Sequence, residues 1–369
     1  MKVALTYPYC WPEVRRGGER LFRDLGVYLS SQGIDVTSVS TGSKARPPIE
    51  PHPQLVRHRA LPDVRLPRGW QLDRPVTYLP FAAASLARLR PDLVHGLFHL
   101  DGVAARLARP LTGRVPYLVH VQGMPRRDNL ERLRAHRALF AASVRKAAAV
   151  IAVSRAASEA LHEELGVTAV PVLNGIFTDA YDGVSLEDRA PVPTVFFPAD
   201  PNDPRKRVVL LATAMGRLEQ EWGSCRLAVA GEPVPSVEEQ VRRALGDRVS
   251  FLGSLGDREM VEAYARAWVT CLPAVREAFG LVIVESLAAG RPCVAVRDGG
   301  VPEILSSQRE QAWLAAPDDA DGLAEALASA LTDSLRADTE DACRATAERF
   351  DWRVRGQDLL DVYRGVLQR

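Results

Sequence analysis

The chain has 369 residues, of which 47% are hydrophobic and 25% are charged. This composition is typical of a soluble globular protein, and the length favours two domains of ordinary size over a single one. The five cysteines are scattered and no pair has CxxC spacing, which disfavours a disulfide framework or a zinc site and favours reduced thiols in a cytoplasmic protein. They are Cys10, Cys225, Cys271, Cys293 and Cys343.

Apolar segments are short throughout the chain. The N-terminal residues contain no long apolar stretch of the kind that forms a signal peptide. The longest apolar run, residues 78–87, is shorter than the roughly 18 residues that a membrane span requires. We therefore expect no membrane-spanning helix.

Charge is distributed unevenly along the chain. Through Ala180 there are 25 Lys and Arg against 15 Asp and Glu, whereas the remainder has 22 against 31. Opposite signs in the two halves indicate domains with different roles. Two interpretations stay open: scattered solvated charge, or a basic half that meets an anionic acceptor or an anionic membrane face.

Short apolar runs alternate with amphipathic segments in the first half. Residues 2–6 predict a buried parallel strand, followed by a glycine-containing loop and a helix over 19–32. This opening favours a parallel sheet with right-handed crossovers. Segment 43–75, rich in proline and arginine, is expected to be irregular and exposed. Further strands are predicted at 34–39, 92–95, 117–121 and 149–153, and a further helix at 129–146.

The alternation restarts after a polar stretch with a Pro-Val-Pro sequence, which predicts a linker over 179–193. The first domain is then 1–178, joined by a final amphipathic helix over 352–369, and the second is 194–351. The sequence therefore predicts an α/β protein with two Rossmann-like domains. Strands of the second domain are expected at 194–197, 226–230, 250–252, 269–272 and 293–296.

The strongest functional pattern is in the second domain. A predicted strand is followed by a loop with Glu277, Phe279 and Gly280, and then by a helix over 281–289 that carries Glu285. Carboxylate oxygens accept hydrogen bonds from hydroxyl groups, so two of them suit a hydroxyl-rich ligand. The helix N-terminus favours a phosphate or sugar oxygen.

The string E-A-F-G-L-V-I-V-E-S-L-A-A-G-R-P, followed by D-G-G-V-P-E, resembles the donor-site signature of family 4 and related retaining glycosyltransferases. The resemblance implies the GT-B fold, with two Rossmann-like domains that face each other across a cleft. It also implies that Glu277 contacts the donor sugar and Glu285 the nucleotide ribose. The backbone at Phe279, Gly280 and Leu281 would meet the sugar and phosphate.

The resemblance covers most of the chain. Gly17 and Gly18 are similar to the first loop of the family, where backbone approaches the donor phosphates and the acceptor, and only glycine allows that approach without a Cβ clash. Gly231 and Leu252 follow strands at positions where the family packs the nucleotide. The last helix is similar to one that crosses back to the first domain.

One departure concerns cations. The family carries an Arg and, about six residues later, a Lys that grip the diphosphate. Here the string is F-F-P-A-D-P-N-D-P-R-K-R, in which Lys206 fits the lysine but Asp200 or Ala199 stands near the arginine position. Arg205 and Arg207 are the candidate replacements, and solvated surface arginines are the alternative.

A second departure concerns a histidine that the family places at a strand end near the reacting carbon. Gln122 occupies that position, and His120 lies two residues back on the same strand face. Gln cannot act as a general base. His120 is either a functional residue or a satisfied core histidine, and the same alternatives apply to His95 and His99 on the acceptor side.

The resemblance implies transfer of a sugar from a nucleotide-diphosphate sugar to an acceptor hydroxyl, with retention, without a metal and without another cofactor. The acceptor would be a small molecule, a glycan or a lipid, and no nucleic acid is expected. The location would be cytoplasmic, with peripheral contact at the inner membrane face left open. Alternatives are a GT-B epimerase or a non-catalytic nucleotide-sugar-binding protein. A nicotinamide dehydrogenase is disfavoured because no GxGxxG follows the first strand.

Overall fold

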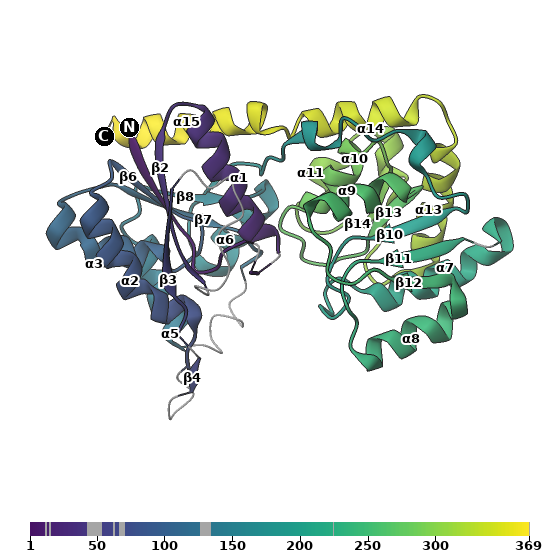
Figure 1. Cartoon of the computed structure of the whole chain (residues 1–369), viewed down its shortest axis with the longest axis horizontal. Helices are drawn as coiled ribbons and strands as arrows, with labels where there is room; N and C mark the ends of the chain where they lie inside the picture. Colours follow the sequence, from purple (N-terminus) through teal and green to yellow (C-terminus); the bar gives the residue numbers. More distant parts are fainter. Residues whose placement is uncertain are drawn as a thin grey trace. The chain divides into compact units, whose positions relative to one another are not determined.

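The computed structural model describes residues 1–11, 13–14, 16–42, 54–61, 63–65, 71–125, 134–223 and 225–368. The chain divides into two compact units. The first consists of Met1–Gly175 with Arg355–Arg369, and the second of Ile176–Val354. Each unit has its own parallel sheet (Figure 1).

The first unit is built on a seven-stranded sheet of order β3-β2-β1-β6-β7-β8-β9, and its neighbouring strands are parallel. The central strands are apolar on both faces because helices cover both sides. The strands are β1 (Lys2–Thr6), β2 (Asp35–Gly42), β3 (Leu55–Arg59), β6 (Leu93–Gly96), β7 (Tyr117–Val121), β8 (Ala149–Ala152) and β9 (Val170–Pro171).

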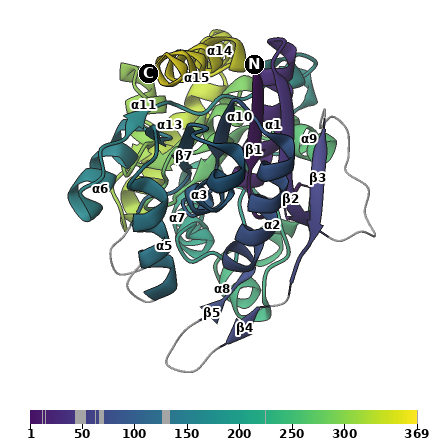
Figure 2. The same ribbon diagram turned by 90° about the vertical axis from the view of Figure 1, so that its left-hand side faces the viewer.

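The helices of this unit begin at defined caps. Asp73 accepts a hydrogen bond from Val76 N at the start of α2, and Ser154 accepts one from Ala157 N at the start of α6. Figure 2 shows α2 packed beside α3. The helices are α1 (Gly17–Ser31), α2 (Arg74–Leu89), α3 (Asp101–Thr112), α5 (Arg134–Val144) and α6 (Arg155–Leu165).

The expectation for segment 43–75 is wrong where the structure describes it. Residues 55–59 form the parallel edge strand β3, and β4 (Val64–Arg65) pairs antiparallel with β5 (Gln71–Leu72). An edge strand has one sheet neighbour and half-buried side chains, so its polar sequence does not show the apolar run of a central strand. Residues 43–53 lie outside the described residues, as do 126–133, where the helix predicted over 129–146 was expected to begin.

The second unit has a six-stranded parallel sheet of order β12-β11-β10-β13-β14-β15. This is the 3-2-1-4-5-6 order of doubly wound folds, in which the strand order reverses beside the first strand. The strands are β10 (Thr194–Phe197), β11 (Arg226–Val229), β12 (Val249–Phe251), β13 (Val269–Leu272), β14 (Cys293–Val296) and β15 (Leu314–Ala315).

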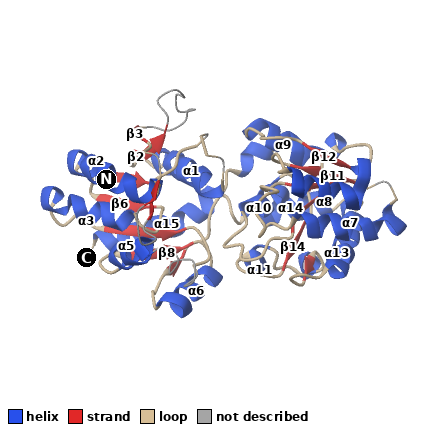
Figure 3. Cartoon of the chain, turned by 90° about the horizontal axis from the view of Figure 1, so that it is seen from below, coloured by secondary structure: helices blue, strands red, loops and turns tan. Residues whose placement is uncertain are grey.

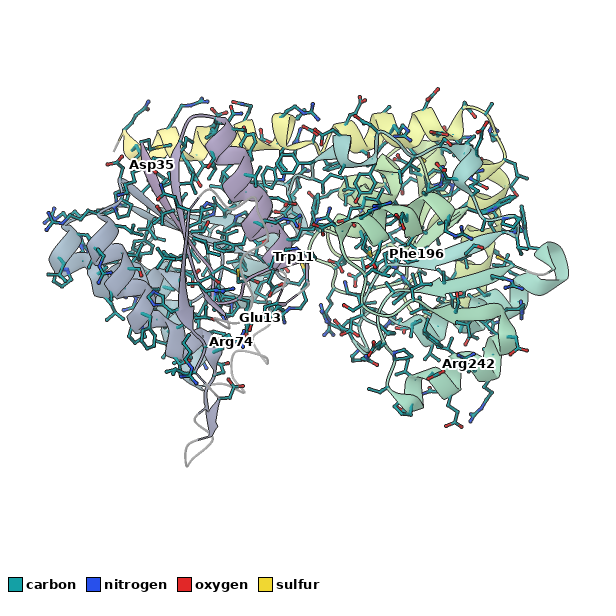
Figure 4. The ribbon with its side chains drawn as sticks, viewed as in Figure 1. Trp11, Glu13, Asp35, Arg74, Phe196 and Arg242 are labelled. Carbon is teal, nitrogen blue, oxygen red and sulfur yellow. The ribbon has the colours of Figure 1, made fainter. Side chains whose placement is uncertain are left out.

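Helices and strands of the second unit enclose an aromatic core. Phe196 of β10, marked in Figure 4, packs edge-on against Tyr264 of α9 with ring centroids 5.2 Å apart. Burying a side chain of this size stabilises the fold by about 1.5–3 kcal/mol. Figure 3 shows the strands of each unit among their helices. The helices of the second unit are α7 (Val208–Trp222), α8 (Pro235–Leu245), α9 (Asp257–Arg266), α10 (Leu281–Ala288), α11 (Val301–Ile304), α12 (Gln308–Gln311), α13 (Ala320–Ser334) and α14 (Thr339–Glu348).

The last helix, α15 (Trp352–Leu367), contributes its residues from Arg355 onward to the first unit. Tyr363 on this helix bonds through its hydroxyl to His95 Nδ1 of β6 (2.7 Å), and Gln357 donates to the hydroxyl of Tyr28 on α1 (3.3 Å). The prediction of an α/β protein with two doubly wound sheets is therefore confirmed. Among the helices of the described residues, none is long and apolar enough to cross a membrane.

Candidate functional site

The candidate donor site lies at the carboxyl ends of strands in the second unit. Lys206 lies in the loop after β10, and Glu277 lies in the loop after β13. These strands are neighbours at the point where the strand order reverses, which is where doubly wound folds bind ligands. The two loops are joined by a hydrogen bond from Val275 N to Arg205 O (3.0 Å).

Lys206 and Glu277 form an ion pair at this edge. Lys206 Nζ lies 2.5 Å from Glu277 Oε2, and the two side chains are 19% and 17% exposed. The lysine backbone is fixed by a hydrogen bond from its amide to Asp203 O (2.9 Å). The site therefore presents one cation and one carboxylate side by side, both partly accessible to a ligand.

The loop that carries Glu277 is shaped by the D-G-G sequence after β14. Gly300 N donates to Glu277 O (2.9 Å), and Arg276 N donates to Asp298 Oδ2 (2.7 Å). Gly299 has φ +59°, and a Cβ at this position would overlap the carbonyl oxygen of Glu277. These residues position the carboxylate, a role that was not expected from the sequence although the D-G-G string belongs to the quoted motif.

Helix α10 follows the Glu277 loop and carries the second predicted carboxylate. Gly280, with φ +100°, is the residue that precedes the helix, and Leu281 begins it. Phe279 is buried and packs on Phe350 with ring centroids 5.7 Å apart. This ring contact therefore anchors the loop directly before Gly280 and the start of α10.

Glu285 is almost completely buried, at 2% exposed. Its Oε2 accepts a hydrogen bond from the hydroxyl of Tyr264 (2.8 Å), which comes from α9. Tyr264 is a residue that sequence reasoning missed, since a single aromatic residue on an amphipathic helix gives no signal of such a contact. The hydroxyl fixes the orientation of the carboxylate.

The two arginines beside Lys206 form ion pairs with other residues. Arg205 pairs with Asp203 (2.6 Å) and is half exposed, whereas Arg207 pairs with Asp318 (2.7 Å), in the loop before α13. Of the three neighbouring cationic residues 205–207, all of them described, Lys206 is the one that forms an ion pair with Glu277. Asp200 accepts a hydrogen bond from Asn202 N (2.9 Å) and supplies no cation.

The loops after β10, β11 and β12 are tied together at the same edge. Gly231 N donates to Gly253 O (2.7 Å), and Leu252 beside it is 40% exposed. Asn202 bridges two loops, because its Nδ2 donates to Glu232 O (2.8 Å) and its Oδ1 accepts from Val234 N (2.7 Å). Asn202 is a second organising residue that was not singled out from the sequence.

In the first unit, Gly17 and Gly18 begin α1 after the loop that follows β1. A Cβ on Gly18 would overlap the Tyr7 hydroxyl, so the glycine permits this approach. Glu19 is completely buried and pairs with Arg16 (2.6 Å). In Figure 4 the labelled Trp11 and Glu13 mark this loop.

Two of the three histidines singled out from the sequence, His95 and His120, form a buried cluster with Tyr363, whereas His99 is half-buried and packs against His136 and Phe140. His95 bonds to the Tyr363 hydroxyl through Nδ1 (2.7 Å) and to His120 Nδ1 through Nε2 (3.2 Å). His95 is the penultimate residue of β6, beside the strand end where the sequence placed it, and it is completely buried. Nε2 of His120 and Nε2 of Gln122 have no hydrogen-bond partner among the described residues, and the same holds for Nε2 of His99.

Burial lowers the pKa of His120 and of His99 to about 3, and it lowers the pKa of His95 well below the usual range, with the neighbouring His120 ring adding to that effect. The cluster therefore stays neutral at pH 7. If the Tyr363 hydroxyl donates to His95, the chain of hydrogen bonds leaves His120 with its proton on Nε2.

Acidification is expected to destabilise the first unit through these histidines. The pKa of each imidazole is lower in the folded chain than in the unfolded chain, so the unfolded chain binds protons first as the pH falls. The contribution of these histidines to the unfolding free energy is therefore complete above about pH 6.5 and is lost as the pH falls towards 3. The unfolding free energy should fall by about 1.4 kcal/mol per pH unit for each imidazole. Urea unfolding between pH 7.5 and 5 measures this slope. A His120→Phe variant should have a shallower slope than the unmodified chain; equal slopes in the two chains would contradict the account.

No group of three or more His, Cys, Asp or Glu side chains in the described part of the chain is arranged to hold a metal ion. Independence of a metal stays a prediction.

Two family models match the chain. Residues 15–180 match the model described as Glycosyltransferase Family 4, and residues 192–333 match the one described as Glycosyl transferases group 1. Between them they span both units, and the chain belongs to this family of glycosyltransferases.

Curated relatives are similar over part of their length. The phosphatidyl-myo-inositol mannosyltransferase of Mycolicibacterium smegmatis is 33% identical over 227 residues, which are 58% of this chain and 57% of the relative. The D-inositol 3-phosphate glycosyltransferase of Saccharomonospora viridis is 37% identical over 171 residues, 43% of this chain and 39% of the relative. The chain thus spans about half the length of the curated relatives it matches.

Solved structures are similar over nearly the whole chain. Sucrose-phosphate synthase from Thermosynechococcus elongatus superposes with a TM-score of 0.81 at 22% identity, covering 100% of this chain and 99% of that one. Anabaena HepE in complex with UDP-glucose gives a TM-score of 0.75 at 19% identity, covering 99% and 100%. At these identities the similarity establishes the fold, which is the predicted GT-B fold.

Proposed function

We propose that the chain transfers a glycosyl group from a nucleotide-diphosphate sugar to an acceptor hydroxyl. The observation that carries the proposal is the Lys206–Glu277 pair at the strand-order reversal of the second unit, directly before the start of α10. Family membership and the names of the relatives support it. The Anabaena protein, whose structure is a complex with UDP-glucose, supports a nucleotide-sugar donor.

In the proposed reaction Lys206 and the amides at the start of α10 stabilise the departing diphosphate. Glu277 accepts hydrogen bonds from sugar hydroxyls, and Glu285, held by Tyr264, accepts them from the ribose. The bond between the anomeric carbon and the phosphate oxygen breaks as the acceptor oxygen bonds to the same face. Attack on this face retains the anomeric configuration, the acceptor proton passes to the departing phosphate, and neither a metal nor another cofactor takes part.

This proton route is consistent with Gln122 at the position where the family has a histidine. Gln122 and His120 offer N–H donors, which orient an oxygen but do not remove a proton. We assign them, with Gly17 and Gly18, to the acceptor side of the reaction.

A thermal-shift screen against UDP, GDP, TDP and ADP sugars tests donor binding. A ligand that binds only the folded chain raises the melting temperature, by an amount set by its concentration relative to Kd. Sugars of one of these nucleotides should raise the melting temperature of the unmodified chain. They should raise that of the Glu285→Gln variant much less. If no nucleotide sugar changes the melting temperature, the proposed function is wrong.

The two alternatives from the sequence, an epimerase and a non-catalytic binder, are not favoured because the relatives are named as transferases. Product analysis separates them from a transferase. An epimerase converts a donor without any acceptor, and a binder shifts the melting temperature without producing a transferred sugar.

We propose further that the acceptor is anionic or lies at a cytoplasmic membrane face. On α3, Leu107 and Leu111 lie one turn apart and are 55% and 68% exposed, and Arg109 of the same helix and Arg88 of the adjoining α2 are also exposed. Exposed leucines and arginines on two adjoining helices suit a surface that combines acyl chains with anionic headgroups. The mannosyltransferase named for phosphatidyl-myo-inositol supports a lipid acceptor.

Vesicle cosedimentation checks this surface. The chain should bind vesicles that contain phosphatidylglycerol, bind neutral phosphatidylcholine vesicles much less, and dissociate as salt screens the arginines. A Leu107→Ser, Leu111→Ser variant should lose most of the binding. Leu335→Ser, at a 62% exposed position in the second unit, is the matched control. Equal binding by all three chains would refute the assignment.

A further inference from the structure

Three arginines gather in the second unit away from the candidate donor pair. Arg189 lies just after the turn at Leu186–Asp188, Arg291 lies between α10 and β14, and Arg344 lies on α14. We call these residues the arginine cluster. Arg291 has no exposed surface, and the other two are partly buried. A completely buried arginine is uncommon unless it is paired, so its partners are informative.

The cluster binds backbone carbonyl groups where helices end. Arg291 Nη2 donates to Ala265 O (2.8 Å) in the last turn of α9 and to Ser185 O (2.5 Å). Arg344 Nη1 donates to Ala288 O (2.9 Å) at the end of α10, and Arg189 Nη1 donates to Ser334 O (2.7 Å) at the end of α13. Helix C-termini carry partial negative charge, so these contacts offset part of the positive charge.

The remaining charge is not balanced by full negative charges. Glu340 is ion-paired with Arg344 (3.1 Å), and Asp188, which is exposed, acts on Arg291 from a distance. Burial, together with the neighbouring Arg189 and Arg344, lowers the pKa of Arg291 to about 10. Among the described residues, the three guanidinium groups thus face one half-buried carboxylate and one solvated one. Such an excess of buried positive charge is costly without a counter-ion.

The arginine cluster also contains hydrogen-bond donors that have no partner among the described residues. Nε and Nη2 of Arg189 are buried and have no partner among the described residues, and the same is true of Nε and Nη1 of Arg291. Nε and Nη2 are the two donors along one edge of a guanidinium, the edge that grips an anion in a bidentate manner. Buried donors in folded proteins almost always have a partner, so these atoms indicate an occupant.

We propose that the arginine cluster is a binding site for a small inorganic anion, held by the open edge of Arg189 and by one of the unpartnered N–H groups of Arg291. A halide ion or a small oxyanion accepts several such donors at once and also offsets the charge. A bound water accepts at most two and offsets no charge. The anion would tie the segment around Ser185 and Arg189 to the ends of α9 and α13, and so stabilise the second unit independently of donor binding.

Thermal unfolding in chloride and in gluconate at matched ionic strength tests the site. Chloride is small enough for a buried site and gluconate is not, so the melting temperature should rise by several degrees in chloride and level off as the site fills. Arg189→Gln should remove this chloride-specific rise. Arg258→Gln, at an arginine 92% exposed on the same unit, should retain it. Binding of the nucleotide sugar should be unchanged by Arg189→Gln, which separates this site from the proposed function.

Crystals grown in bromide supply a readout that needs no variant. The anomalous signal of bromide should place an ion within hydrogen-bond distance of the Arg189 and Arg291 guanidinium groups. Equal melting temperatures in chloride and gluconate, or a water molecule in place of bromide at these atoms, would overturn the proposal.

Discussion

Replacing Glu277 with alanine is expected to abolish glycosyl transfer while the chain stays folded. The carboxylate lies at the strand-order reversal, 2.5 Å from Lys206, and its backbone is held by Gly300. Its side chain is partly exposed and lies in a loop outside the strands and helices, so we expect the fold to tolerate the change. Loss of one preorganised polar group of this kind lowers kcat by about 10²–10³. Steady-state transfer assays with the donor selected by thermal shift measure the effect.

Two further variants make the Glu277 result interpretable. Glu277→Gln keeps the size of the side chain but forms no ion pair with Lys206, and it should be nearly as inactive as the alanine variant. Glu238→Gln, at a partly exposed glutamate on α8, should be fully active. Near-normal turnover by Glu277→Ala, with an unchanged melting temperature, would refute the role of this residue.

Replacing Lys206 with methionine is the second change with a large expected effect. Methionine keeps the apolar stem but removes the cation that stabilises the leaving diphosphate, so kcat should fall by about 10²–10³. Because the positive charge is needed most as the phosphate departs, kcat should fall more than KM rises. Pre-steady-state and steady-state assays separate the two parameters.

The neighbouring arginines serve as matched controls for Lys206. Arg205 and Arg207 are ion-paired with Asp203 and Asp318 rather than with Glu277, so Arg205→Gln and Arg207→Gln should each lower kcat by less than tenfold. A larger loss in either arginine variant than in Lys206→Met would assign the diphosphate to a different cation.

The sheets follow closely from the sequence because central parallel strands are buried on both faces. Runs such as 2–6, 117–121, 194–197 and 293–296 are apolar without alternation, and each is a strand with the predicted bounds. β3 was missed because it lies at an edge, where half-buried polar side chains such as His58 are tolerated. The position of Glu277 and Lys206 at adjacent strand ends could also be predicted, since it depends only on strand order.

Contacts between residues distant in sequence could not be predicted. Tyr264 reaches Glu285 from a different helix, and the hydroxyl of Tyr363 meets His95 from the far end of the chain. Each of these residues lies on an amphipathic helix, where an inward-facing tyrosine is an ordinary core residue. The overlap that a Cβ on Gly299 would make with Glu277 O likewise depends on how two loops pack, which no local pattern encodes.

A crystal structure with a bound nucleotide-diphosphate sugar tests the donor site most directly. We expect a diphosphate within hydrogen-bond distance of Lys206 Nζ and the first amides of α10, sugar hydroxyls on Glu277, and the ribose on Glu285. A nucleotide bound elsewhere on the chain, with these two carboxylates making no contact to it, would contradict the assignment of the donor site.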